Sequence, residues 1–406
     1  MNAGQHLGNT KAILESLNWF TDSKKISYFQ VLNWSPDYLS LIDIVGKFVY
    51  IGLIDYIPFI FPFLGRPLFN FFSMRKRIEK ICNNTILESE IQMYHRFHFD
   101  SLNSFETISN YWFWLEEVSK LWIKTVSKEE DEDIKQHKLI SLLAQTLHVV
   151  QDFYSHSNWI EYFHDTYNYS KVEDFPTWFD IFKADDNSNS SIIEDLKHAD
   201  IHTGYFPIGK DLKLSKFYHN DKKNKPGLNK DRSERPYFDV VYYLAWKNGI
   251  QWLNYLKDNF FSDNLILILN KPLGKEYEQL AKKIQPYIKK IAFKVREWNG
   301  TEPFHDLKIQ LLDPIVFDEY ISFTVKLTVS EKLIKYDRDF RKSFFKFILR
   351  SEEKIIANVT KFGNKKGFTK FNLKINNLTN YHSEEKLFLK VKYGLLIDEK
   401  LIVRKN

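Results

Sequence analysis

The chain has 406 residues, which is enough for one large domain with a small one, or for two to three modest domains. Hydrophobic residues make up 44% of it and aromatic residues 17%, which predicts a packed core and argues against a disordered chain. The net charge of +6 favours contact with anionic lipid or nucleic acid, and the single cysteine, Cys82, excludes a disulfide framework within the chain.

The first 40 residues begin with a polar segment and continue with a helical pattern. The apolar side chains of Ala12, Ile13, Leu17 and Phe20 recur at the spacing of one helix face. No basic start followed by an apolar core and a cleavage site is visible, so no signal peptide is expected. Three alternatives stay open: a cytoplasmic protein, export by a non-classical route, or a chain that has already been trimmed.

Residues 41–72 are the most apolar part of the chain, but charged residues and prolines interrupt them. Pro58 and Pro62 break any long helix, and no uninterrupted apolar run reaches about 20 residues, so no membrane span is predicted. Two alternatives remain for this stretch. It is either a buried helical hairpin or an aromatic loop in which Phe61 and Phe63 contact lipid or wall a substrate cleft.

Residues 73–127 are predicted to form two helices, and the acidic run 129–137 a solvated loop with a helix start. The helix that follows, within residues 138–163, carries an apolar stripe at three- and four-residue steps. Beside that stripe, His148, Asp152 and His156 are spaced i, i+4, i+8 and project from nearly one face. Two imidazoles and a carboxylate in this arrangement are suitable zinc ligands, although ordinary polar surface residues would give the same pattern.

Residues 164–236 are rich in loops, and amphipathic or basic helices are predicted for 236–262 and 275–298. Lys230 and Arg232 lie in a basic stretch that would either hold a phosphate or form a solvated loop.

After residue 300 the pattern changes to short β-branched and aromatic runs at about ten-residue spacing. Roughly seven such strands predict a small antiparallel β-sandwich. The chain is therefore divided into a helical metal-binding catalytic domain, residues 1–300, and a β-sandwich domain, residues 301–406. The lysines of the second domain would suit an anionic membrane, and a role in stabilising the chain or binding a partner protein is an equal alternative.

Several motifs resemble those of the Het-C (heterokaryon incompatibility C) family, which is itself similar to zinc-dependent phospholipase C and the P1-type nucleases. The central run LHVVQDFYSHSNWIE, residues 147–161, agrees throughout. The segments QHLGNTKAI, MYHRFHFDS, HTGYF and GLNKD also look like their counterparts in the family.

This resemblance implies a mainly helical fold of the phospholipase C/P1 nuclease type that binds two or three zinc ions. The metal ligands it implies are His6, His98, Asp100, His148, Asp152, His156, His219 and Asp239. Asp239 enters this set because no histidine occurs in the closing helix, where the family places a histidine or an acid. Asp100 and Asp152 would also have a catalytic role at the reacting water, and Lys230 would bind substrate.

Three functions are compatible with such a site. The first is a zinc-dependent phosphodiester hydrolase of phospholipase C type that acts on phospholipids, as a cell-death or toxin-like effector, since clustered zinc ions activate water and neutralise phosphoryl charge. The second is a single-strand nuclease of P1 type, with basic residues of 222–235 on the nucleic-acid backbone. The third is a non-enzymatic Het-C-like toxin or recognition protein with structural zinc. We favour the first, with a phospholipid membrane as partner ahead of nucleic acid.

Overall fold

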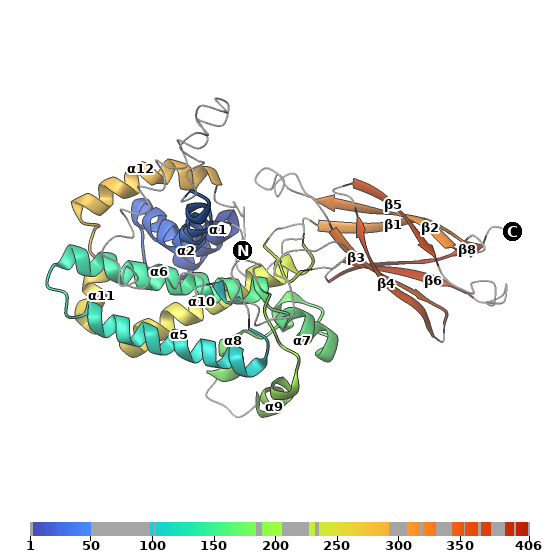
Figure 1. Ribbon diagram of the computed structural model, residues 1–406, viewed down its shortest axis with the longest axis horizontal. Coiled ribbons are helices and arrows are strands. Elements are labelled where there is room, and N and C mark those ends of the chain that lie inside the picture. Colours follow the sequence, from blue (N-terminus) through green and yellow to red (C-terminus); the bar gives the residue numbers. More distant parts are fainter. Residues whose placement is uncertain are drawn as a thin grey trace.

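The computed structural model comprises a helical region and a β region that lie side by side (Figure 1). The residues that it describes are 3–49, 98–100, 102–183, 189–204, 227–231, 235–291, 307–316, 320–329, 343–352, 354–363, 367–374, 386–393 and 395–404. Helices come first and two sheets follow, as the sequence predicts. The predicted boundary at residues 300 and 301 lies outside the described residues.

Ten α-helices and one 3₁₀ helix make up the helical region within the described residues. They are α1 (Ala3–Leu17), α2 (Ser23–Val49), α5 (Phe105–Val126), α6 (Glu132–His156), α7 (Trp159–Tyr167), η3 (Val172–Asp174), α8 (Trp178–Phe182), α9 (Ser190–His198), α10 (Phe238–Phe260), α11 (Asp263–Asn270) and α12 (Lys275–Ile291). The helices predicted for the N-terminal segment, the central motif and the segments 236–262 and 275–298 correspond to α1, α6, α10 and α12.

Helix α6 begins in the acidic run, as predicted. The side chain of Asp131 accepts hydrogen bonds from the backbone N–H groups of Asp133 and Ile134, which satisfies two of the donors that a helix start leaves unpaired. The acidic residues of the first turn also face the positive end of the helix dipole.

Helix α6 is buried on nearly every side, and not along one stripe alone. It packs against α2, α5, α10 and α11, with α2 and α10 on different sides of it (Figure 1). Its polar side chains are therefore buried with its apolar ones, and they find partners in the neighbouring helices. Trp252 of α10 donates from Nε1 to Thr146 Oγ1 over 3.0 Å, and Gln145 donates from Nε2 to Ser35 Oγ over 3.0 Å.

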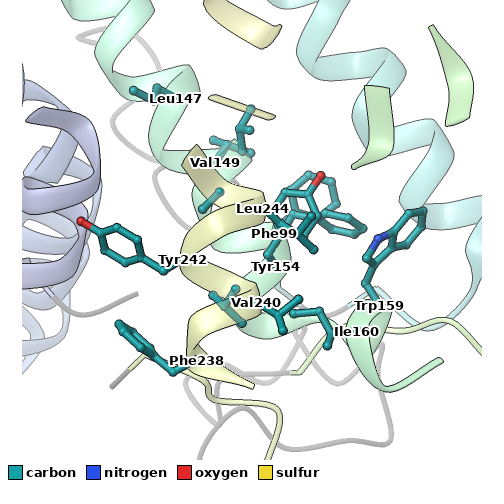
Figure 2. Close-up of a cluster of buried hydrophobic side chains, with 14 of the residues drawn as sticks. Phe99, Leu147, Val149, Tyr154, Trp159, Ile160, Phe238, Val240, Tyr242 and Leu244 are labelled. Carbon is teal, nitrogen blue, oxygen red and sulfur yellow. The ribbon is translucent and has the colours of Figure 1, made fainter. Parts of the chain in front are cut away.

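Side chains of α6, α7 and α10, with Phe99, form a continuous apolar cluster (Figure 2). The ring centroid of Phe99 lies 4.8 Å from that of Phe153. Helix α10 approaches α1 and α6 closely at Gly249, where an added Cβ would lie 2.5 Å from Ile13 Cδ1 and 2.9 Å from Leu147 Cδ1. The absence of a side chain at this glycine thus allows three helices to meet.

Eight strands in two four-stranded sheets form the described β region. They are β1 (Leu307–Val316), β2 (Tyr320–Val329), β3 (Ser343–Arg350), β4 (Ile355–Gly363), β5 (Gly367–Lys374), β6 (Phe388–Tyr393), β7 (Leu396–Leu401) and β8 (Val403–Arg404). The strand orders are β5-β2-β1-β8 and β4-β3-β6-β7. Neighbouring strands are antiparallel except for β1 and β8, whose pairing is parallel.

Rings from both sheets meet between them. The centroid of Phe347 on β3 lies 4.9 Å from that of Phe323 on β2 and 4.8 Å from that of Phe371 on β5. All three rings are buried, because alternate residues of each strand point to the same face. The two sheets therefore pack face to face with an aromatic core, which is the arrangement of a β-sandwich.

Several sequence predictions concern residues outside the described part of the chain. They are Phe61, Phe63, His219, Arg232, and, of the two helices predicted within 73–127, the basic helix at 74–81 and most of the helix at 85–105. Of the apolar stretch 41–72, residues 41–49 form the end of α2. Among the described helices, none combines the length and apolar character needed to cross a membrane.

Candidate metal centre

Five segments that are far apart in the sequence meet at the C-terminal half of α6. Each segment contributes histidine or aspartate side chains that lie close together. They are His6 of α1, Asp37 of α2, His98 and Asp100, the α6 residues His148, Asp152 and His156, and Asp231. The i, i+4 spacing on α6 stacks Asp152 one turn after His148, so both reach the same space.

Asp152 lies at the centre of this group. Its Oδ1 is 3.0 Å from His6 Nε2, and its Oδ2 is 3.1 Å from His148 Nε2 and 3.3 Å from His98 Nδ1. Burial alone would raise the pKa of Asp152, but the positive charges that face it, among them those of His156, hold that pKa well below its usual range. The carboxylate is therefore ionised inside the protein.

Four residues, Asp37, His98, His148 and Asp152, could hold a metal ion, because one ligand atom from each lies within 4.8 Å of all the others. Asp37 Oδ1 is 3.7 Å from His98 Nδ1 and 3.8 Å from His148 Nε2, and these two nitrogens are 3.3 Å apart. Two donors bound to one tetrahedral zinc ion at their usual bond lengths lie about 3.3 Å apart. The atoms of His98, His148 and Asp152 match this spacing, and Asp37 Oδ1, which lies further out, completes a set of two nitrogens and two oxygens of the kinds that zinc binds.

The ring of His148 is suited to bind a cation. Burial, with the charge of His6, lowers the pKa of His148 to about 4, against the opposing effect of Asp152 and Asp37. The ring is therefore neutral near pH 7 and keeps a lone pair for a metal. The polar contacts of the ring are made by Nε2, which faces Asp152 and His98, whereas Nδ1 is buried and has no hydrogen-bond partner among the described residues.

His98 reaches the cluster through an unusual backbone conformation. Phe99, the next residue, has φ of 51°, which is uncommon for a bulky side chain, and its ring is fully buried. This turn lets neighbours on both sides of Phe99 contact α6: His98 faces Asp152, and Asp100 faces His156. Burial opposes protonation of His98, but its hydrogen bond to Asp152 and the nearby carboxylates raise its pKa. Strain of this kind is typical of functional sites.

Gln151 fixes the orientation of His6. Asn9 donates from Nδ2 to the carbonyl of Tyr242 over 2.9 Å, so Asn9 Oδ1 must be the acceptor for Gln151 Nε2, 3.0 Å away. This orients the amide of Gln151 with Oε1 toward His6 Nδ1, 2.7 Å away, and that oxygen can only accept. His6 Nδ1 therefore carries a proton.

The neutral form of His6 then has an unprotonated Nε2, 3.0 Å from the ionised Asp152 Oδ1. Two acceptor atoms at that distance require a cation between them, either a proton or a metal ion. Histidine ligands of metals are commonly oriented by such a hydrogen bond at the other ring nitrogen.

His156 lies beside the four-residue cluster and bridges two further carboxylates. Its Nδ1 is 3.2 Å from Asp100 Oδ1, and its Nε2 is 3.0 Å from Asp231 Oδ1 and 3.8 Å from Asp152 Oδ1. Burial lowers its pKa, but the charges of Asp152, Asp231 and Asp100 outweigh that effect and raise it to about 10. Without a bound cation, His156 is thus an imidazolium that neutralises these carboxylates.

Two acidic residues of the site were missed by sequence reasoning. Asp37 stands in a helix without a recognisable motif, and the only signal was an acid within a largely apolar segment. Asp231 belongs to the segment GLNKD, from which the sequence prediction took Lys230.

Lys230 is buried and donates from Nζ to the carbonyl of Ser157 over 2.5 Å and to the Glu161 carboxylate over 3.1 Å. Asp239 lies in the first turn of α10, outside the four-residue cluster, and lines a small cavity with Tyr393 and Leu396 of the β region.

Comparison of the chain with models of protein families, with curated proteins and with solved structures finds no match. The resemblance of its motifs to the Het-C family therefore stays a prediction.

Proposed function

We propose that the protein is a zinc-dependent phosphodiester hydrolase of phospholipase C type, with a helical region of the phospholipase C/P1 nuclease fold. The observation that carries this proposal is the convergence of two imidazole nitrogens and two carboxylate oxygens, from Asp37, His98, His148 and Asp152, within 4.8 Å. His6, which Gln151 orients toward Asp152, and His156, with Asp100 and Asp231 beside it, provide donors for a second ion.

The exposure of these side chains favours a catalytic ion over a purely structural one. The side chains of His148 and Asp152 are buried at 0% and 1% exposure, whereas those of His98 and Asp37 are 12% and 29% exposed. The cluster thus extends from the interior to the surface at Asp37, and water and substrate would reach it from that side. Structural zinc sites are closed and usually rich in cysteine, whereas catalytic sites keep a position open for water.

A bound zinc ion would lower the pKa of a water toward ~7 and neutralise charge on a phosphoryl group. Asp37 is the most exposed acceptor of the cluster, so its carboxylate would orient that water and accept its proton. Asp152 is enclosed by histidines and would position them without contacting water. Asp100 would contribute its charge beside the ring of His156, whose Nδ1 has the carbonyl of His98 as its hydrogen-bond partner. Since His98 and His156 carry raised pKa values, metal binding would displace protons.

The test begins with metal analysis of protein purified without chelators, followed by hydrolysis assays on phospholipid vesicles and on single-stranded DNA. His148→Ala and Asp152→Asn should each lower zinc content, thermal stability and hydrolysis together, because the ion would join α2, the segment of His98 and α6. His198→Ala is the matched control, since that ring is 80% exposed and contacts only Glu194 of its own helix in the described structure.

Three results would contradict the proposal in different ways. Protein that holds no metal and gains no stability from added zinc would remove the metal centre. If zinc-loaded protein hydrolyses neither substrate, the ion has a structural role and not a catalytic one. If DNA is cleaved faster than phospholipid, the proposed metal chemistry holds but the proposed substrate is wrong.

A further inference from the structure

The sheet β4-β3-β6-β7 has one face against the other sheet and one face turned away from it. Alternate residues of the two middle strands, among them Phe347 of β3 and Val391 of β6, are buried between the sheets. The residues between them therefore point outward. On β7, Asp398 accepts a hydrogen bond from the backbone N–H of Leu311 in β1, so its neighbours Ile397 and Glu399 also point outward.

The strand register gives the composition of this outer face, because residues opposite each other on paired strands share a face. In order from β4 to β7, one row is Ile355, Arg350, Phe388 and Leu401, and the next is Asn358, Ile348, Lys390 and Glu399; a third contains Lys346, Lys392 and Ile397. We call these eleven residues the basic sheet face. Its cations lie on the middle strands, and its most exposed aliphatic side chains, Ile355 at 64%, Ile397 at 49% and Leu401 at 49%, lie on the edge strands.

The basic sheet face has an excess of positive charge that the described residues leave unbalanced. Glu399 is paired with Arg350, whose Nη2 lies 2.7 Å from Glu399 Oε1. No carboxylate of the described chain comes within ion-pair distance of Lys346, Lys390 or Lys392. Burial lowers the pKa of Lys392, and the charges of Lys390 and Lys346 lower it further, whereas the charge of Asp165 in α7 raises it. The three ammonium groups therefore repel one another.

The strand register places two of these lysines side by side. Lys346 and Lys392 are directly opposite each other on neighbouring antiparallel strands, an arrangement that destabilises a sheet. A local arrangement that works against folding, without a compensating contact, is typical of a surface kept for binding. An anionic partner would remove the repulsion.

The aliphatic side chains decide which anionic partner fits. A nucleic-acid backbone offers nothing to exposed isoleucine and leucine, and base stacking needs open aromatic faces. Phe388 is covered by the guanidinium of Arg350, 5.0 Å from its ring centroid. A lipid surface, in contrast, takes up aliphatic side chains among its acyl chains while its anionic headgroups contact lysines. We propose that the basic sheet face binds a membrane surface that contains anionic phospholipid.

This surface would bring the metal centre to lipid under the proposed function, but its binding requires neither metal nor hydrolysis. The test is co-sedimentation of the full chain with vesicles of phosphatidylcholine, with and without phosphatidylserine. The triple variant Lys346→Gln, Lys390→Gln and Lys392→Gln should bind the phosphatidylserine vesicles about 100-fold more weakly, at about 5-fold for each lysine. Higher salt should weaken the wild-type binding in the same direction.

The chain offers a matched control on the other sheet. Lys326 of β2 and Lys370 and Lys374 of β5 point outward there, because their neighbours Val325, Phe371 and Leu373 are buried. Changing all three to Gln removes the same charge from the same region, and should reduce binding only a few-fold. Ile397→Ser with Leu401→Ser tests insertion: this variant should bind less tightly at every salt concentration. Circular dichroism melts of each variant report whether the sheet is intact.

The outcomes separate this inference from the proposed function. The inference would be overturned if phosphatidylserine did not increase vesicle binding by the wild-type chain, or if both triple lysine variants lost the same amount of vesicle binding. Either result would count whatever substrate the chain hydrolyses. Loss of single-stranded DNA binding in the first triple, with vesicle binding unchanged, would make the face a nucleic-acid surface. Vesicle binding that is retained in chelator-treated, inactive protein would support the inference.

Discussion

Gln151→Leu is the sharpest test of how the centre is organised. The substitution keeps the size of the side chain but removes the oxygen that accepts from His6 Nδ1, 2.7 Å away. His6 can then rotate or carry its proton on Nε2, the atom that faces Asp152. Loss of a partner that orients a metal-binding histidine typically costs 10–100-fold in affinity, or about 1.4–2.8 kcal/mol. We expect zinc affinity to fall by that factor.

The same substitution should also destabilise the metal-free protein. At least two buried groups, His6 Nδ1–H and Asn9 Oδ1, lose their partner at residue 151. At about 1–3 kcal/mol for each unpaired group, the free energy of unfolding should fall by about 2–6 kcal/mol. Gln151→Glu keeps an accepting oxygen toward His6, so its zinc affinity should stay within a few-fold of the wild type.

Zinc affinity is measured by competition with a chromophoric chelator, and stability by urea unfolding of the metal-free protein. Gln145→Leu is the control, since that amide is buried on the same helix and donates to Ser35, away from the histidines. It should lower stability and leave zinc affinity unchanged. If Gln151→Leu binds zinc as tightly as the wild type, or if the control loses as much affinity, the orienting role of Gln151 is refuted.

Two further predictions concern the helical framework. Burial lowers the pKa of Lys25 to about 8 from 10.5, against the opposing charge of Asp22. Between pH 8 and 10.5 the unfolded chain therefore binds more protons at Lys25 than the folded protein does. The free energy of unfolding of the wild type should rise over this pH range relative to that of Lys25→Met. Urea titrations in which the difference between the two proteins does not change with pH would contradict this. Gly249→Ala should cost about 1–3 kcal/mol in the same assay, because its Cβ overlaps Ile13 and Leu147, and Ile13→Val should recover part of that loss if the overlap is the cause.

Periodicity explains what could be predicted from the sequence. The i, i+4 spacing identified His148 and Asp152 as a pair, since four residues advance a helix by one turn plus about 40°. Eight residues advance it by two turns plus about 80°, so His156 is rotated from His148 and contacts Asp100 and Asp231, while its Nε2 still lies 3.8 Å from Asp152 Oδ1. The spacing therefore predicted that these side chains lie together, but not that His156 would have two further carboxylates beside it.

The remaining residues of the candidate metal centre could not be found by spacing at all. Asp37 is brought to His148 by the packing of α2 on α6, and no periodic pattern relates residues on separate helices. Similarly, the strand pattern after residue 300 predicted the sandwich, but the pairing of Lys346 with Lys392 depends on the register between β3 and β6. Register follows from the buried side chains of both strands and from the other sheet.

The position of His6 has a consequence for the order of events during biosynthesis. His6 and Asp152 are separated by 146 residues, so a ribosome working at about 5–20 residues per second needs roughly 7–30 s to make the second after the first. For most of that interval α1 can pack on α2, but α6 is still incomplete, and α10, which also covers α1, is made only after α6. The part of α1 that faces α6 and α10 must therefore stay unpacked or be shielded until then, and the proposed metal site can link α1 to α6 only after more than a third of the chain has been made.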